Sequence, residues 1–143
     1  MPPTKRNKVN QRIPLSEEKK QEIILDVEKV IFEEREYLDP DLTIEKLSAK
    51  VGVNSKYLSS VISEKYGQTF PNFINEIRIK EAVRLLTDKD FDHYSLEGIG
   101  QMVGFRSKSS FNIAFKKFTG VTPSYFRKQI RQLTTSRKFE TVS

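Results

Sequence analysis

One sequence pattern occurs twice in this chain and limits the possible folds more than any other feature. Val51-Gly52 and Ser55-Lys56 return 52 residues later as Val103-Gly104 and Ser107-Lys108. The next five matches have an offset of 53 residues and pair Leu58, Ile62, Gly67, Thr69 and Phe73 with Phe111, Phe115, Gly120, Thr122 and Phe126. The change of offset indicates one inserted residue, which we place early in the second helix of the second copy. A duplication with conserved spacing predicts two similar structural units in one chain.

Each copy has the pattern of two short helices joined by a turn. In the second copy, Ser95 is placed to cap a helix with apolar residues at helical spacing, and Gly104 interrupts that helix. Ser107 can cap the next helix, which carries three phenylalanines on one face. In the first copy, Thr43 and Asn54 stand at the two capping positions. Two short helices joined by a glycine turn form a helix-turn-helix.

These signals predict an all-α fold of about seven helices, in which two helix-turn-helix subdomains are joined by a long linker helix. A linker of about 16 residues would span roughly 25 Å. The expected division of the chain is a disordered basic leader (1–15), an N-terminal amphipathic connector helix (16–38), the first helix-turn-helix (39–70), the linker helix (71–87), the second helix-turn-helix with a closing helix (88–132) and a flexible tail (133–143).

Charge is distributed unevenly along the chain. Residues 16–48 contain 11 acidic and five basic side chains, whereas residues 49–143 contain 16 basic and eight acidic ones. Between Glu97 and Glu140 there are nine lysines and arginines and no acidic residue. A basic block of this kind is typical of a protein that binds a polyanion such as nucleic acid.

Composition also limits the chemistry that the chain can perform. It has no cysteine, which excludes disulfides and thiolate metal sites and favours a reducing, cytoplasmic environment. Its single histidine, His93, lies in a polar segment without the convergent groups that a catalytic or metal site needs. No secretory signal or run of 18 apolar residues is present, so we expect no membrane contact. The sequence predicts no enzyme activity, no metal and no cofactor.

The second copy resembles the signature of the AraC/XylS-type bacterial transcription regulators. The residues that carry the resemblance are Ile99, Gly104-Phe105, Ser107, Ser110-Phe111, Phe115-Lys116-Lys117, Gly120-Val121-Thr122-Pro123 and Tyr125-Phe126-Arg127. The resemblance covers about residues 40–132. It implies sequence-specific binding of double-stranded DNA in transcription regulation, contact with RNA polymerase, and a sensing or dimerisation domain that is missing from this chain.

Two positions depart from the family pattern. Gly100 replaces the usual alanine, and we expect this glycine to weaken its helix by about 1 kcal/mol. Ile113 stands where many members have a polar or basic residue.

The second helix of each unit would present side chains to base edges in the major groove. The candidate base contacts are Asn54, Lys56, Ser59, Ser60, Lys108, Ser109, Asn112 and Ile113. Asn112 can pair with adenine, Lys56 and Lys108 with guanine, and Ile113 can meet a thymine methyl group. Asn54 is equally suited to cap a helix, the lysines could contact only phosphate, and the serines could merely allow close approach.

Phosphate contacts should be more numerous and less specific than base contacts. The candidates, which include the helix starts at Thr43 and Ser95, are Thr43, Lys65, Ser95, Arg106, Lys116, Lys117 and Arg127. Arg78 stands in the middle of the linker helix, where the family resemblance implies a structural arginine that ties the two units together.

One alternative function remains open at this point. The helix expected at 16–38 has an apolar stripe and an acidic face, so it could pack on the domain or bind a partner. If it binds a partner, the chain would be a helical protein–protein interaction module that acts through the acidic helix 16–38. That interpretation leaves the basic block unexplained.

Overall fold

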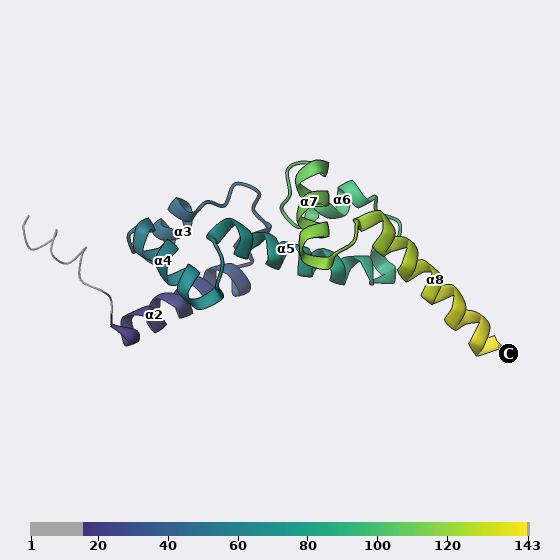
Figure 1. The fold of residues 1–143 in the computed structure, drawn as a ribbon, viewed down its shortest axis with the longest axis horizontal. Coiled ribbons are helices and arrows are strands. Elements are labelled where there is room, and N and C mark those ends of the chain that lie inside the picture. Colours follow the sequence, from purple (N-terminus) through teal and green to yellow (C-terminus); the bar gives the residue numbers. More distant parts are fainter. Residues whose placement is uncertain (1–15, 143) are drawn as a thin grey trace, which may run out of the picture.

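The computed structural model describes residues 16–142, with side chains up to Ser136. Over this range the chain forms seven α-helices and no strand (Figure 1), which confirms the all-α prediction. The helices are α2 (Glu17–Glu28), α3 (Ile44–Val51), α4 (Ser55–Tyr66), α5 (Phe70–Leu86), α6 (Leu96–Met102), α7 (Lys108–Thr119) and α8 (Pro123–Val142). The leader expected at 1–15 lies outside the described residues.

The N-terminal segment is not the single helix expected over 16–38. After α2, the chain forms a π-helical turn (η1, Lys29–Glu33) and a short 3₁₀ helix (η2, Glu36–Leu38). Between them, Arg35 adopts a left-handed conformation with φ of 57°. The change of direction buries the side chain of Tyr37 and brings its carbonyl oxygen to α5. A tertiary contact therefore interrupts a helix that local sequence would allow to continue.

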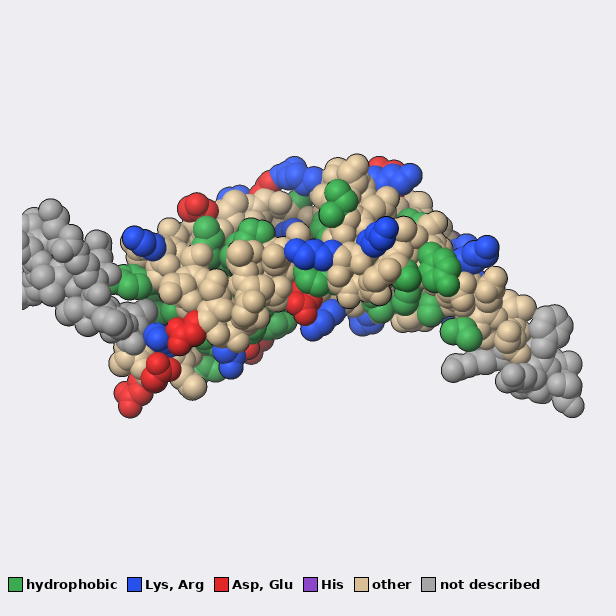
Figure 2. All heavy atoms as spheres, viewed as in Figure 1, with side chains coloured by type: hydrophobic (Ala, Val, Ile, Leu, Met, Phe, Trp, Pro, Cys, Tyr) green, Lys and Arg blue, Asp and Glu red, His purple; other side chains and the backbone are tan. Residues whose placement is uncertain are grey.

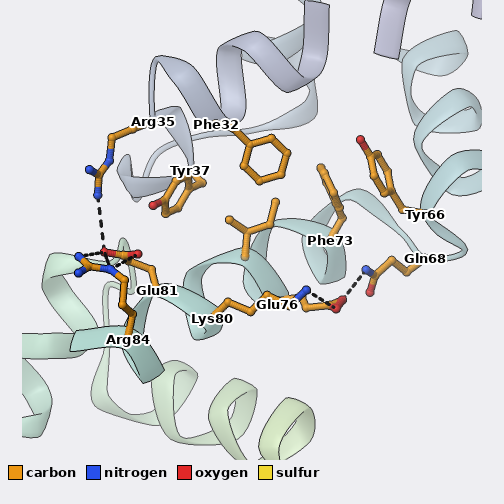
Figure 3. Close-up of a pocket in the computed structure, with 11 residues that line it drawn as sticks. Phe32, Arg35, Tyr37, Tyr66, Gln68, Phe73, Glu76, Lys80, Glu81 and Arg84 are labelled. Carbon is orange, nitrogen blue, oxygen red and sulfur yellow. Dashed lines mark hydrogen bonds and ion pairs between the residues drawn. The ribbon is translucent and has the colours of Figure 1, made fainter. Parts of the chain in front are cut away.

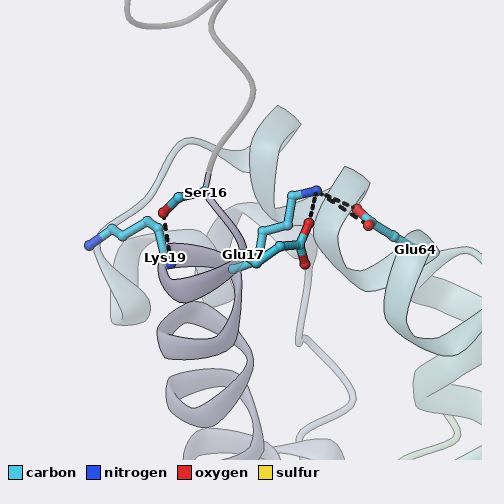
Figure 4. A network of polar contacts seen from close by, with 5 residues as sticks. Ser16, Glu17, Lys19 and Glu64 are labelled. Carbon is cyan, nitrogen blue, oxygen red and sulfur yellow. Dashed lines mark hydrogen bonds and ion pairs between the residues drawn. The ribbon is translucent and has the colours of Figure 1, made fainter.

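The start of α2 is fixed both locally and by the first unit. The Ser16 hydroxyl accepts a hydrogen bond from the Lys19 backbone N–H at 3.1 Å and caps the helix. The Lys20 ammonium donates to the Glu64 carboxylate of α4 at 3.0 Å (Figure 4). The Lys20–Glu64 ion pair joins the start of α2 to the end of α4.

Two hydrophobic cores flank α5. The first core includes the fully buried residues Val27, Ile31, Leu47, Leu58 and Ile62, and the second includes Ile79, Ile99, Val103, Phe111 and Phe115. α5 contributes Phe73 and Ile74 to the first core and Ala82 and Leu86 to the second. One helix therefore serves as a wall of both units, as expected of the linker.

The two second helices match in length, which corrects the position of the inserted residue. α4 and α7 each contain 12 residues, and their N-caps are Asn54 and Ser107, 53 positions apart. The extra residue therefore lies in the turn before α7 and not inside α7. As a result, Lys56 corresponds to Ser109 in the fold, and Ser60 corresponds to Ile113.

The last helix is longer than expected. α8 continues to Val142 rather than ending near residue 132, and it extends away from the second unit (Figure 1). No proline or glycine follows Pro123, so no residue in the sequence breaks the helix.

Gly100 permits close packing rather than simply weakening α6. A Cβ atom at this position would lie 2.8 Å from Cγ of Phe111, which is almost fully buried. The glycine therefore allows α6 and α7 to approach one another.

Candidate nucleic-acid interface

α4 and α7 each bury one face and expose the opposite one. Side chains on an α-helix advance by about 100° per residue, so a residue two positions after a buried one points away from the core. Leu58 and Phe111 are buried, and Ser60 and Ile113 are exposed. The remaining exposed residues on these two outward faces are Lys56, Ser63, Ser109 and Lys116.

Most of the candidate base contacts lie on or beside these outward faces. Ser59 is exposed at the side of α4, and its counterpart Asn112 is half-buried at the same side of α7. Lys108 is exposed at the first position of α7. Asn54 has a structural role, because its Oδ1 accepts a hydrogen bond from the Lys56 backbone N–H at 2.8 Å and caps α4.

Three of the predicted phosphate contacts already have partners within the protein. Arg106 forms an ion pair with the Asp41 carboxylate. The Lys117 ammonium donates to Asn72 Oδ1 at 2.9 Å. Arg127 donates to the Tyr94 carbonyl oxygen at 2.7 Å, and burial together with the charge of Arg131 lowers the pKa of its guanidinium. These cations hold elements together in the described structure.

Thr43 and Ser95 act at helix starts, as predicted. The Thr43 hydroxyl accepts from the Lys46 backbone N–H at 3.2 Å, and the Ser95 hydroxyl accepts from the Gly98 backbone N–H at 2.9 Å. Lys65 lies away from the outward faces, at the end of α4 in a groove shared with α2.

Arg78 is buried between the two units. Its Nε donates to the Tyr37 carbonyl oxygen at 2.6 Å and its Nη2 to the Asp39 carbonyl oxygen at 2.8 Å, while its guanidinium lies 5.8 Å from the centre of the Phe105 ring. Burial lowers the pKa of Arg78, and the negative charge of Asp39 opposes this shift. These contacts agree with the structural role that the family resemblance implied.

The turn of the second unit fits closely around Arg78. Gly104 has φ of +105°, and a Cβ atom there would lie 2.7 Å from Arg78 Nε and 2.9 Å from the Tyr37 carbonyl oxygen. Only glycine satisfies both the backbone conformation and the available space.

We call the contacts of Arg78, the Arg106–Asp41 ion pair and the Lys117–Asn72 hydrogen bond the inter-unit seam. Asp41 and Asn72 could not be predicted from the sequence, because their partners Arg106 and Lys117 lie far along the chain and no local pattern connects them. The seam joins segments on both sides of α5, so the two outward faces have a defined relative position.

Charge differs between the ends of the molecule. In Figure 2, acidic side chains gather at the α2 end, and lysine and arginine side chains lie over the second unit. In α2 the exposed acidic residues include Glu18, Glu22 and Asp26. A polyanion would therefore be attracted to the second unit and repelled by α2.

A groove of about 630 Å³ lies between the η1 region and α5 (Figure 3). Its apolar lining includes Phe32 and the stacked rings of Tyr66 and Phe73, whose centroids are 4.0 Å apart. At its rim, Glu81 pairs with Arg35 at 3.6 Å and with Arg84 at 2.6 Å. Both arginines at the rim are therefore already paired with a carboxylate of the chain.

His93 is exposed and its ring lies 4.3 Å from that of Tyr94. In the part of the chain that the structure describes, no group of three His, Cys, Asp or Glu side chains could hold a metal ion. The same residues contain no helix long and apolar enough to cross a membrane.

The fold matches that of known regulators. A family model described as a helix-turn-helix domain matches residues 47–129, which is more than half of the chain. The chain belongs to the AraC-type helix-turn-helix family. The fold is similar to that of a Chromobacterium violaceum transcriptional regulator described as containing an AraC-type DNA-binding domain. The TM-score is 0.65 at 22% identity, and the match covers 78% of this chain and 95% of that one.

Two further similar proteins are closer in sequence. The melibiose operon regulatory protein of Escherichia coli K12 is 32% identical over 97 residues, which are 68% of this chain and 31% of that protein. The C-terminal domain of AraT, a response regulator from Geobacillus stearothermophilus, is 28% identical with a TM-score of 0.67, covering 75% of this chain and 84% of that domain. The chain thus spans less than a third of the length of the melibiose regulator.

This AraC-type chain binds DNA in transcription regulation. Its fold and family are those of DNA-binding regulators and not of enzymes.

Proposed function

We propose that the chain binds double-stranded DNA with α4 and α7 in two consecutive segments of the major groove. The observation that supports this most directly is the pair of corresponding outward faces, held in a defined position by the inter-unit seam. α5 has 17 residues and is therefore about 25 Å long, and successive major-groove faces are about 34 Å apart. The length of α5 plus the width of the two units is of that order.

In this proposal, the base contacts come from residues on or beside the outward faces. They are Lys56, Ser59 and Ser60 in the first unit, and Lys108, Ser109, Asn112 and Ile113 in the second. Asn112 would pair with adenine, and each lysine would donate to guanine or to a nearby phosphate.

The phosphate contacts divide into two groups. Lys116 and the backbone N–H groups at the starts of α3 and α6 are available for phosphate, and Thr43 and Ser95 cap these starts. We assign Arg106, Lys117 and Arg127 to holding the fold, because each already has a partner in it.

The proposal also covers the domain division and the larger regulator. Segments 39–70 and 88–132 would be the DNA-binding units, and 16–38 would connect them to a sensing or dimerisation domain of the same regulator. Exposed Leu25 and Phe32 on this acidic segment support a connecting or partner-binding role. The regulator would act in the cytoplasm and contact RNA polymerase.

The test is to bind the chain to a random-sequence duplex pool of 30 base pairs across a salt series and to sequence the bound fraction. With about six phosphate contacts, log K should fall against log salt with a slope of roughly −5. Two enriched base clusters about one helical turn apart are expected. A flat salt dependence without enrichment would refute the proposal.

Variants sharpen this test. Asn112→Ala should lower the preference for the enriched site by about 1–3 kcal/mol, and Lys116→Ala should weaken binding to all sequences and reduce the slope by about 1. Lys65→Ala is the matched control, because it removes one positive charge away from the outward faces and should leave the slope unchanged. If Lys65→Ala and Lys116→Ala had equal effects on binding, the assignment of the outward faces as the DNA-contacting surface would be wrong.

A further inference from the structure

The outward face of α7 has an apolar side chain at its centre. Ile113 is 71% exposed, the highest value among the exposed large hydrophobic side chains of the described residues. It lies two positions after buried Phe111, so it points away from the core at about 200° around the helix. Its neighbours on this face, Ser109 and Lys116, are polar. Packing within the chain therefore does not explain the isoleucine.

The chemistry of the major groove offers one match for such a side chain. Base edges there present hydrogen-bond donors and acceptors, and the only apolar group among them is the 5-methyl group of thymine. An isoleucine placed against a donor or acceptor would remove that group from water without replacing its hydrogen bond, which is unfavourable. Asn112, the adjacent residue, has the side chain suited to adenine. Both residues therefore favour A·T pairs.

We propose that Ile113 is a specificity-determining residue that recognises the 5-methyl group of a thymine in the half-site of the second unit. The inference rests on the DNA binding proposed above and names the base that α7 reads. The first unit differs, because Ser60 occupies the corresponding position of α4 and carries a hydroxyl group that donates or accepts hydrogen bonds. The two units therefore read different sequences, which gives the bound site a direction.

The experiment replaces single thymines by deoxyuridine in the enriched duplex from the selection above. This change removes only the methyl group and leaves the hydrogen-bonding edge intact. In the half-site of the second unit, one deoxyuridine should weaken binding of the unaltered chain about fourfold, which corresponds to about 0.8 kcal/mol for one buried methyl-sized group.

Ile113→Ala should bind the thymine duplex more weakly and should bind thymine and deoxyuridine duplexes equally. Ser60→Ala, at the corresponding position of α4, is the matched comparison. It should alter binding through the first half-site only and retain the fourfold difference in the second. Both positions are exposed, so both variants should keep the urea unfolding midpoint of the unaltered chain, which circular dichroism can check.

The outcomes separate this inference from the proposed function. Salt-dependent, sequence-selective binding with no effect of deoxyuridine at any thymine would overturn the role of Ile113 and leave DNA reading in place. An unchanged thymine preference in Ile113→Ala would overturn it as well. Loss of all sequence enrichment in the unaltered chain would remove both proposals.

Discussion

Replacing Gly100 by alanine tests how closely α6 packs on α7. Helix propensity alone predicts that this change stabilises α6 by about 1 kcal/mol. The structure predicts the opposite sign, because the added Cβ atom would lie 2.8 Å from Cγ and 2.9 Å from Cδ2 of Phe111. The Phe111 ring cannot move aside easily, since its centre lies 5.4 Å from that of Phe105 and 5.7 Å from that of Phe115.

The size of the effect follows from two opposing contributions. Overpacking of a tight core typically costs about 1–3 kcal/mol. The contact here is with the base of the ring, which is held by the backbone of α7. We therefore take about 2 kcal/mol for the strain. Subtracting about 1 kcal/mol for improved helix propensity leaves a net loss of about 1 kcal/mol in the free energy of unfolding.

The first unit suggests how to relieve this strain. Ser48 and Leu58 occupy the positions that correspond to Gly100 and Phe111, so a residue with a side chain there faces a smaller apolar partner. Phe111→Leu should therefore cost less in the Gly100→Ala background than in the unaltered chain. We expect a coupling free energy of about 1 kcal/mol or more between the two substitutions.

The assay is urea unfolding of the unaltered chain, both single variants and the double variant, followed by circular dichroism. A Gly100→Ala variant that is more stable by about 1 kcal/mol, with additive effects in the double variant, would refute the packing argument. It would mean that α6 and α7 can separate at little cost.

Two further predictions concern buried polar contacts. Arg78→Ala should lower the free energy of unfolding by about 3 kcal/mol, because two hydrogen bonds from a charged donor are lost at about 1.5–3 kcal/mol each. In urea unfolding, Arg78→Lys should retain part of this stability. A loss below about 1 kcal/mol for Arg78→Ala would contradict the stabilising role of Arg78 in the inter-unit seam. Burial and the hydrogen bond donated to Glu28 raise the pKa of Tyr66. Its contribution to stability should therefore be present below about pH 10, the unfolded pKa, and decline above it. In urea unfolding at a series of pH values, Tyr66→Phe should lose less stability above pH 10 than the unaltered chain, and equal losses would contradict the role of Tyr66.

Local signals in the sequence were sufficient for the helix starts and for the linker helix. Ser16, Thr43, Ser95 and Ser107 each cap the helix predicted to follow them, because a cap joins residues only three positions apart. The linker helix runs from Phe70 to Leu86, close to the predicted 71–87. Periodic apolar residues also identified the buried faces, and with them the outward faces of α4 and α7.

Long-range contacts determined what local patterns could not. Sequence matching placed the inserted residue in α7, whereas the caps place it in the turn that carries Arg106 to Asp41. The sequence likewise offered Arg106 and Lys117 as free phosphate contacts, because a charged residue looks the same whether its partner is DNA or another part of the chain. The sequence by itself determined two units with two exposed helix faces, since both depend on neighbours along one helix. Only the tertiary structure decided which cations have partners within the chain and how the two faces are held, since both depend on residues about 40 or more positions apart.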